Sequence, residues 1–158
     1  MSSPSLPPFH LAFPIKSISD TRAFYIDILG CDEGRSTEAW IDFDFFGHQL
    51  SAHVRPEAGQ NKGAGDVDGD AVPIPHFGAV LEWEKWHELA DKLKAANVKF
   101  LLEPKIRFKG EPGEQGTFFV EDPAGNGLEF NTFRDPAMIF AHGVGHLMAR
   151  NRPCESGP

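Results

Sequence analysis

The sequence predicts an α+β fold made of two similar modules, each with a strand, a helix and then three further strands. Strand-like runs begin each half, an amphipathic helical segment follows each run, and short alternating segments follow each helix. With 158 residues, of which 41% are hydrophobic, the chain can form one compact domain or two small packed modules. We expect a flexible tail at 1–7, a domain at 8–134 with modules at 8–55 and 73–134 joined by a connector at 56–72, and a C-terminal arm at 135–158.

The first module begins with alternating apolar residues in the segment 9–13. The segment 17–30, SISDTRAFYIDILG, predicts a helix that Ser17 or Ser19 caps and that Gly30 ends. Apolar and acidic residues alternate in 39–45, AWIDFDF, which predicts a strand with one buried side, and a turn leads into a second strand at 48–54.

The second module repeats this order, with a strand in 73–83 and a helix in 84–97. Strands are expected at 98–102, 116–122 and 127–133, with the Pro- and Gly-containing sequence DPAGNG as the turn between the last two. The stretch between the modules is rich in Gly, Asp and Pro, so it predicts a flexible connector or exposed loop. The apolar stripe of the helix is expected at Trp86, Leu89, Ala90 and Leu93.

Three polar residues stand among apolar neighbours in the predicted strands: His10, His76 and Glu129. Successive side chains of a strand point to opposite faces, so these three can share the sheet face that the helices do not cover. If the modules pair as one curved sheet, that face becomes a concave pocket. Two imidazoles and one carboxylate can hold a divalent metal with coordination positions left open. The sequence therefore predicts a metalloenzyme.

The net charge of −8 and the isoelectric point near 5.3 argue against nucleic acid or an anionic membrane as a partner. No apolar run approaches the roughly 20 residues that span a bilayer, and the first ten residues lack the pattern of a signal peptide. We expect a cytoplasmic protein whose two cysteines, Cys31 and Cys154, are free thiols.

The repeated module, RAFYIDILG in the first helix and EDPAGNGLEF before the last strand resemble the vicinal oxygen chelate superfamily. Glyoxalase I, bleomycin resistance proteins and extradiol dioxygenases belong to it. The resemblance covers roughly residues 8–134 and implies metal ligands on the first and fourth strands of each module. They match His10, His76 and Glu129, with Ser51 at the fourth place. The set of two histidines and one glutamate is closest to the extradiol dioxygenases.

This likeness implies Fe(II), with Mn, Ni, Co or Zn as alternatives, and an oxygenase that acts on a small vicinal diol or enediol chelated to the metal. His53, two residues beyond Ser51 on the same face, is the candidate acid or base. Ring-cleaving members also place a tyrosine before the carboxylate, whereas this chain has GTFFV there. Its only tyrosine, Tyr25, lies among core positions of the first helix.

Further residues are candidates for contact with a substrate. The segment 105–119 contains a Gly- and Pro-rich loop that could be mobile and reach the pocket, or could be a solvated hairpin. Phe118 and Phe119 point to opposite faces, so one is expected in the core. The candidate substrate-binding residues are Ser51, His48, Arg107, Lys109, Gln115 and Phe119.

The C-terminal arm contains His142 and His146 at the i,i+4 spacing that can chelate a metal on a helix, although Gly143 and Gly145 disfavour that helix. The other interpretation is an apolar arm that docks on the domain or on a second subunit. We expect a homodimer.

Two other functions remain open from the sequence. A metal-dependent isomerase, epimerase or lyase could act through an enediolate with the same ligands. A protein similar to the bleomycin resistance proteins could instead bind a small molecule or drug without chemistry. The three ligand-type residues distinguish an enzyme from such a binding protein.

Overall fold

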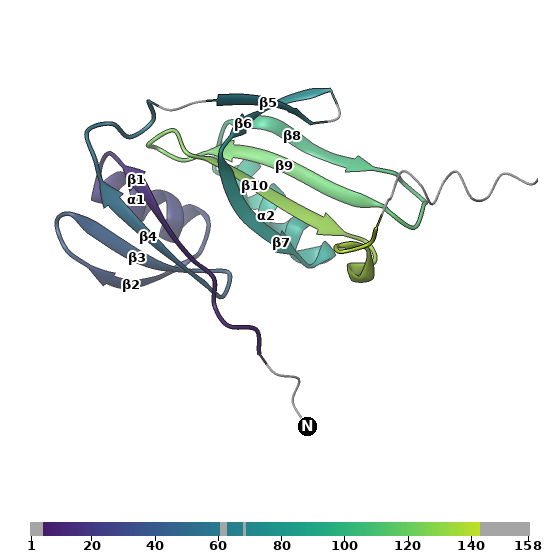
Figure 1. Cartoon of the computed structure of the whole chain (residues 1–158), viewed down its shortest axis with the longest axis horizontal. Coiled ribbons are helices and arrows are strands. Elements are labelled where there is room, and N and C mark those ends of the chain that lie inside the picture. The colour runs from purple at the N-terminus through teal and green to yellow at the C-terminus, as the bar shows by residue number, and fades with distance from the viewer. Residues whose placement is uncertain (1–4, 61–62, 68, 143–158) are drawn as a thin grey trace, which may run out of the picture.

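The computed structural model describes residues 5–60, 63–67 and 69–142. It contains two four-stranded mixed sheets that lie side by side, each with a helix on one face (Figure 1). The predicted α+β fold with two similar modules is therefore confirmed. The two sheets are separate and do not form a closed barrel.

In module 1, β1 is parallel to β4, whereas β2 and β3 pair in antiparallel fashion, which gives the order β1-β4-β3-β2. Ser17 accepts a hydrogen bond from the backbone of Asp20 and so caps the helix, and Gly30, with a φ of 80°, follows its end. The elements are β1 (His10–Ile15), α1 (Ile18–Arg22), which continues as a π-helix η1 (Ala23–Ile28), β2 (Asp32–Ser36), β3 (Trp40–Phe45) and β4 (His48–Val54).

Module 2 has the same topology, in the order β7-β10-β9-β8, with β7 parallel to β10. Its helix presents the predicted apolar stripe to the core, and Asn97, with a φ of 55°, follows the helix end. A 3-10 helix η2 (Pro136–Met138) follows the module. The module elements are β7 (His76–Leu81), α2 (Trp83–Ala95), β8 (Phe100–Arg107), β9 (Gln115–Glu121) and β10 (Gly127–Phe133).

The segment between the modules contains an antiparallel hairpin that the sequence did not predict. It consists of β5 (Gly63–Val67) and β6 (Asp70–Ile74) and lies at the top of Figure 1. Its strands contain few apolar residues in alternation, so the usual sequence signal of a strand is weak there. An ion pair of 2.7 Å between Asp70 and Lys105 attaches it to module 2.

The core runs continuously through both modules. The Phe13 ring of β1 lies 5.0 Å from the Phe77 ring of β7. The Tyr25 hydroxyl donates a hydrogen bond of 3.0 Å to the Asp122 carboxylate, which precedes β10. The Asn126 side chain also donates to the Pro14 carbonyl at 2.9 Å. These contacts join the two modules into one packed body.

Burial governs the titration of the groups in this core. It raises the pKa of the Asp122 carboxyl, against the effect of hydrogen bonds from Asn126, Tyr25 and Ala124. Burial and the nearby Asp122 charge raise the pKa of Tyr25 well above its usual value. Burial also raises the pKa of the free thiol of Cys31 to about 12. Cys154 lies outside the described residues.

The helices of the described part of the chain are all too short or too polar to cross a membrane.

We expect Tyr25→Phe to lower the free energy of unfolding by about 1–3 kcal/mol, because the buried Asp122 carboxylate loses a donor that reaches it across the two modules. Urea unfolding followed by circular dichroism measures this change. Arg22→Gln is the control, since it breaks an ion pair with Glu33 that is partly exposed on both sides and is expected to cost less stability than Tyr25→Phe. Equal stability of Tyr25→Phe and the wild type would contradict the structural role of this bond.

Candidate metal centre

His76 and Glu129 meet on the open face of the module 2 sheet, the face away from α2. His76 is the first residue of β7, and Glu129 lies on the neighbouring strand β10. The Nε2 atom of His76 is 2.9 Å from Oε2 of Glu129, and each side chain is about one-fifth exposed. The parallel pairing of β7 with β10 therefore brings together two residues that are far apart in the sequence.

Hydrogen bonds hold both side chains in this position. The Pro73 carbonyl lies 2.7 Å from Nδ1 of His76, and because a carbonyl only accepts, Nδ1 must carry the proton of this bond. Thr117 on β9 donates to Oε1 of Glu129 at 2.9 Å. The Phe119 ring stands edge-on to the imidazole, with 4.9 Å between centroids. The Nε2 of His76 and the Oε2 of Glu129 thus remain directed at each other.

A glycine opposite Glu129 makes this approach possible. Gly78 on β7 is the register partner of Glu129, and a Cβ atom at Gly78 would lie only 1.5 Å from the Glu129 carbonyl oxygen. No side chain can occupy that position without moving β10. The sequence pattern does not single out Gly78, because the partner of a glycine within an apolar run is known only once the strand register is known.

His10 has the same kind of support on the other sheet. Its Nδ1 lies 2.9 Å from the side-chain oxygen of Gln49, its partner on β4. Since that amide oxygen is an acceptor, Nδ1 of His10 also carries the proton, and Nε2 is the nitrogen suited to a metal. Module 1 therefore presents a second oriented imidazole.

The structure joins His76 to Glu129 but does not bring His10 to them. Within residues 5–60, 63–67 and 69–142, no group of three or more His, Cys, Asp or Glu side chains is placed to hold a metal ion. The sequence pattern predicts that the open faces of one chain form a single pocket. In the structure each sheet has its own open face, and the modules contact each other through their cores.

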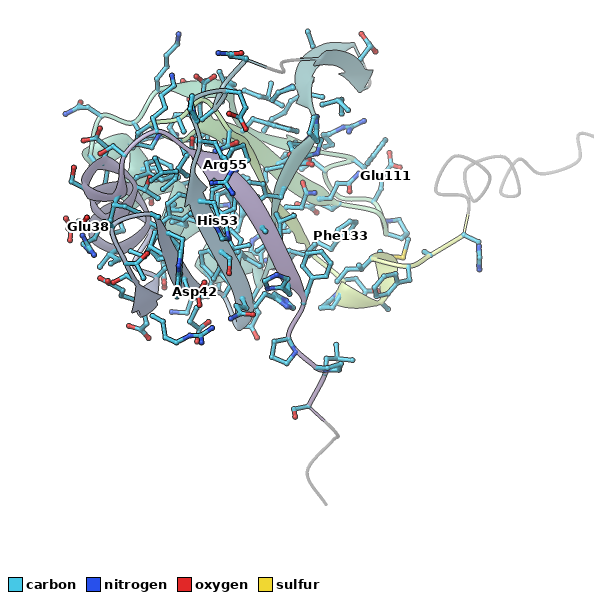
Figure 2. The ribbon with its side chains drawn as sticks, turned by 60° about the vertical axis from the view of Figure 1, so that its left-hand side comes forward. Glu38, Asp42, His53, Arg55, Glu111 and Phe133 are labelled. Carbon is cyan, nitrogen blue, oxygen red and sulfur yellow. The ribbon has the colours of Figure 1, made fainter. Side chains whose placement is uncertain are left out.

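The other candidates of module 1 have different surroundings. Ser51 is buried and donates a hydrogen bond of 2.5 Å to Asp42. His53 lies two residues further along the same face of β4, partly buried, and Figure 2 shows it with Asp42 on one side of β1. The Nδ1 of His48 accepts a hydrogen bond from the Phe9 backbone at 2.9 Å, so His48 supports the entry into β1.

In module 2, Phe119 is the candidate that touches the centre. Phe118 is fully buried in the core, which confirms the expectation that one of these two residues lies there. Arg107 and Gln115 face each other at the far ends of β8 and β9, and the Arg107 guanidinium lies 5.2 Å from the Phe108 ring centroid. Lys109 is exposed.

The loop between β8 and β9 is built from hydrogen-bonded turns. The backbone of Glu111 donates to Phe108 and that of Glu114 donates to Glu111, both at 3.0 Å. The Glu114 side chain also accepts from the Gly110 backbone. This bonding matches the predicted hairpin better than the predicted mobile loop.

The C-terminal arm begins with a short capped turn, in which Asp135 accepts a hydrogen bond from Ala137. Ile139 and Phe140 then line an apolar pocket of about 770 Å³ together with Val80 of β7. His142 is exposed, and His146 lies outside the described residues, so chelation by this pair stays a prediction.

Two βαβββ modules, each with a metal-type histidine at the start of its first strand, define a class of paired-module protein. Residues 8–130 match the model of the Glyoxalase/Bleomycin resistance protein/Dioxygenase superfamily. The chain therefore belongs to this family. The sequence search of curated proteins found no match.

Solved structures share the fold. A glyoxalase/bleomycin resistance protein/dioxygenase from Alicyclobacillus acidocaldarius is 30% identical, with a TM-score of 0.71, over 89% of this chain and 100% of that one. The fosfomycin resistance protein FosX from Listeria monocytogenes is 18% identical, with a TM-score of 0.61, over 88% and 100%. A lactoylglutathione lyase from Agrobacterium tumefaciens is 16% identical, with a TM-score of 0.55, over 82% and 96%.

We expect Gly78→Ala to displace Glu129 and to lower the free energy of unfolding by about 1–3 kcal/mol, because the added methyl group overlaps the β10 backbone. Urea unfolding gives the stability change, and proton-nitrogen NMR spectra report the movement of β10. Val80→Ala is the matched control, since Val80 lies on the same face of β7 and is half exposed. A Gly78→Ala spectrum unchanged around Glu129 would contradict the required close approach.

Proposed function

We propose that this protein is a metal-dependent enzyme that acts on a small substrate with two adjacent oxygen atoms. The observation that supports the proposal is the pair formed by His76 and Glu129, with a second, equally oriented imidazole at His10. Superfamily membership supports the same class of function. The metal ligands in the proposal are His10, His76 and Glu129.

The donor atoms fit a divalent first-row metal. Two ligand atoms that each lie about 2.1 Å from a metal, at a right angle to each other, are about 3 Å apart. The Nε2 atom of His76 and the Oε2 atom of Glu129 are 2.9 Å apart, which is close to this spacing. Metal-binding histidines usually donate their other ring N–H to a nearby oxygen, as both His10 and His76 do. Two histidines and one carboxylate form the ligand set typical of non-haem Fe(II) oxygenases, and Mn, Ni, Co or Zn are the alternatives.

A second copy of the chain supplies the third ligand in this proposal. A two-fold dimer can place His10 of one copy beside His76 and Glu129 of the other, which creates two equal sites. Within the described residues, β1 pairs with β4 alone and β7 with β10 alone, so each ligand-bearing sheet has a free edge. Phe9, Val80 and Phe140 expose apolar surface, which suits such an interface.

When bound, the metal would supply a positive charge that favours the ionised form of the substrate oxygens. Thr117, Pro73 and Gln49 keep the ligand side chains oriented for that task. Phe119 limits water on the module 2 side, since its ring is nearly buried beside His76. His53 stays the proposed acid or base. It lies opposite Pro14, two rows from His10 along the open face of module 1, so in this proposal it exchanges a proton with a part of the substrate that extends along β4. Oxygenation of a catechol-type diol is the proposed reaction, on the basis of the ligand set.

The surroundings of Tyr25 favour a second candidate function. The only tyrosine is fully buried and bonded to Asp122, so no phenol is available on either open face to assist ring cleavage. Proton transfer by His53 alone would serve an isomerase, epimerase or lyase that works through an enediolate. A protein that only binds its ligand, without catalysis, would be distinguished by ligand binding that does not require the metal.

Metal analysis followed by oxygen uptake tests the proposal. We expect about one divalent metal per chain after anaerobic purification in the presence of Fe(II), and oxygen consumption on at least one member of a catechol panel. Bound metal without oxygen uptake would favour the isomerase or lyase. Failure of Fe, Mn, Ni, Co and Zn to bind would contradict the enzyme proposal in both forms.

A mixing experiment tests the shared site. His10→Ala and His76→Ala should each lose metal binding as homodimers, because every site lacks one imidazole. When the two variants are mixed, the heterodimer has one site with both histidines intact, so about a quarter of the wild-type sites should return after random exchange. Mixing His76→Ala with Glu129→Ala is the control. Both residues lie in module 2 and come from the same copy in each site, so no heterodimer has an intact site. Full metal binding by His10→Ala alone would contradict the assignment.

A further inference from the structure

A pocket of about 430 Å³ lies on the open face of the module 1 sheet and includes Gln49, the register partner of His10. Gln49, which orients His10, is part of its wall, so the pocket adjoins a candidate ligand of the metal centre. Its lining includes Gly34, Arg35, Asp42, Asp44, His48 and Gln49.

The strand register fixes where Asp42 lies relative to His10. His10 is opposite Gln49, which is opposite Asp44, and the next row on the same face contains Ala12, Ser51 and Asp42. Asp42 is thus two strands across and one row along from His10. Standard strand spacings place their Cα atoms about 12 Å apart. A small ring with a short side chain, held at His10, can extend across Gln49 to Asp42.

Asp42 has a buried carboxylate whose oxygens have only part of their hydrogen-bonding capacity filled. Its side chain is 7% exposed. Ser51 donates one short hydrogen bond to Oδ1, and Arg35 reaches Oδ2 at the long distance of 3.4 Å. A carboxylate can accept about four hydrogen bonds, so Asp42 has capacity for a further donor.

The arginine contact is open to exchange with a ligand. The Arg35 side chain is 81% exposed, and its guanidinium lies 5.6 Å from the Trp40 ring centroid. Ion pairs with an exposed partner contribute little to stability, so a substrate group can replace Arg35 at Oδ2 at low cost. Gly34 leaves space beside Asp42, since a Cβ at Gly34 would lie only 3.2 Å from the Asp42 Cβ.

We infer that Asp42 determines substrate specificity by accepting a hydrogen bond from a hydroxyl or ammonium group at the end of the substrate remote from the metal. This inference rests on the proposed function. The pocket has two carboxylates, Asp42 and Asp44, against one guanidinium, so it disfavours a carboxylate or phosphate in the same place. The preferred substrate is a chelating diol with a donor group on its side chain.

Four catechols that differ only in the side chain at position 4 test the inference: aminoethyl, hydroxyethyl, carboxymethyl and ethyl. Calorimetry with the metal-loaded protein measures their binding. We expect the aminoethyl or hydroxyethyl compound to bind at least about tenfold more tightly than the carboxymethyl compound. Asp42→Asn should reduce this preference at least about fivefold, and it should leave binding of the ethyl compound unchanged. Asp91→Asn, an exposed change on α2, is the matched control.

The outcomes separate the inference from the proposed function. Equal binding of all four catechols, or a preference that Asp42→Asn retains, would overturn the role of Asp42 while leaving the metal site intact. If none of the catechols binds, the proposed function fails, and a titration of ethanolamine followed by NMR decides the inference. Shifts at Gly34 and Gln49 that Asp42→Asn abolishes would support the pocket, and unchanged spectra would overturn it.

Discussion

The parallel pairing of the first and last strands in each module is the constraint on which the rest of the structure depends. It places β1 beside β4 and β7 beside β10, although the paired strands are separated by the whole module. Because side chains alternate along a strand, this pairing sends apolar residues to the helix and polar residues to the open face. The oriented histidines, their hydrogen-bond partners and the pocket at Asp42 all follow from that register.

The two modules use the same pairing for different chemistry. On module 2, glycine opposite Glu129 allows a carboxylate and an imidazole to meet. On module 1, the corresponding face has Ser51 and Asp42 bonded to each other, and its histidine is held by Gln49. Module 2 therefore presents two of the proposed ligands, and module 1 presents the third together with a polar pocket. This asymmetry suits a site that combines metal binding with recognition of the substrate side chain.

Much of the fold was predictable from the sequence because its signals are local. The cap at Ser17, the glycine after the first helix and the apolar stripe of α2 depend only on residues within a few turns. The β5–β6 hairpin was missed because its strands contain few apolar residues in alternation. The pairing of His76 with Glu129 was predicted from the duplicated pattern, which acts as an internal guide to register.

The arrangement of the modules relative to each other was not predictable, because it depends on which surfaces are more favourable to bury. Phe13, Tyr25 and Phe45 form aromatic contacts with one another or with Phe77 and Phe130 of module 2, which favours contact through the cores. Within the described residues of one chain, no pocket collects His10, His76 and Glu129. The apolar residues of the two modules have similar sequence patterns. The patterns alone therefore do not show whether the modules contact each other through their cores or enclose a metal between their open faces. Burial of the aromatic cores within each chain is thus the physical reason for our proposal that the complete site lies between two copies.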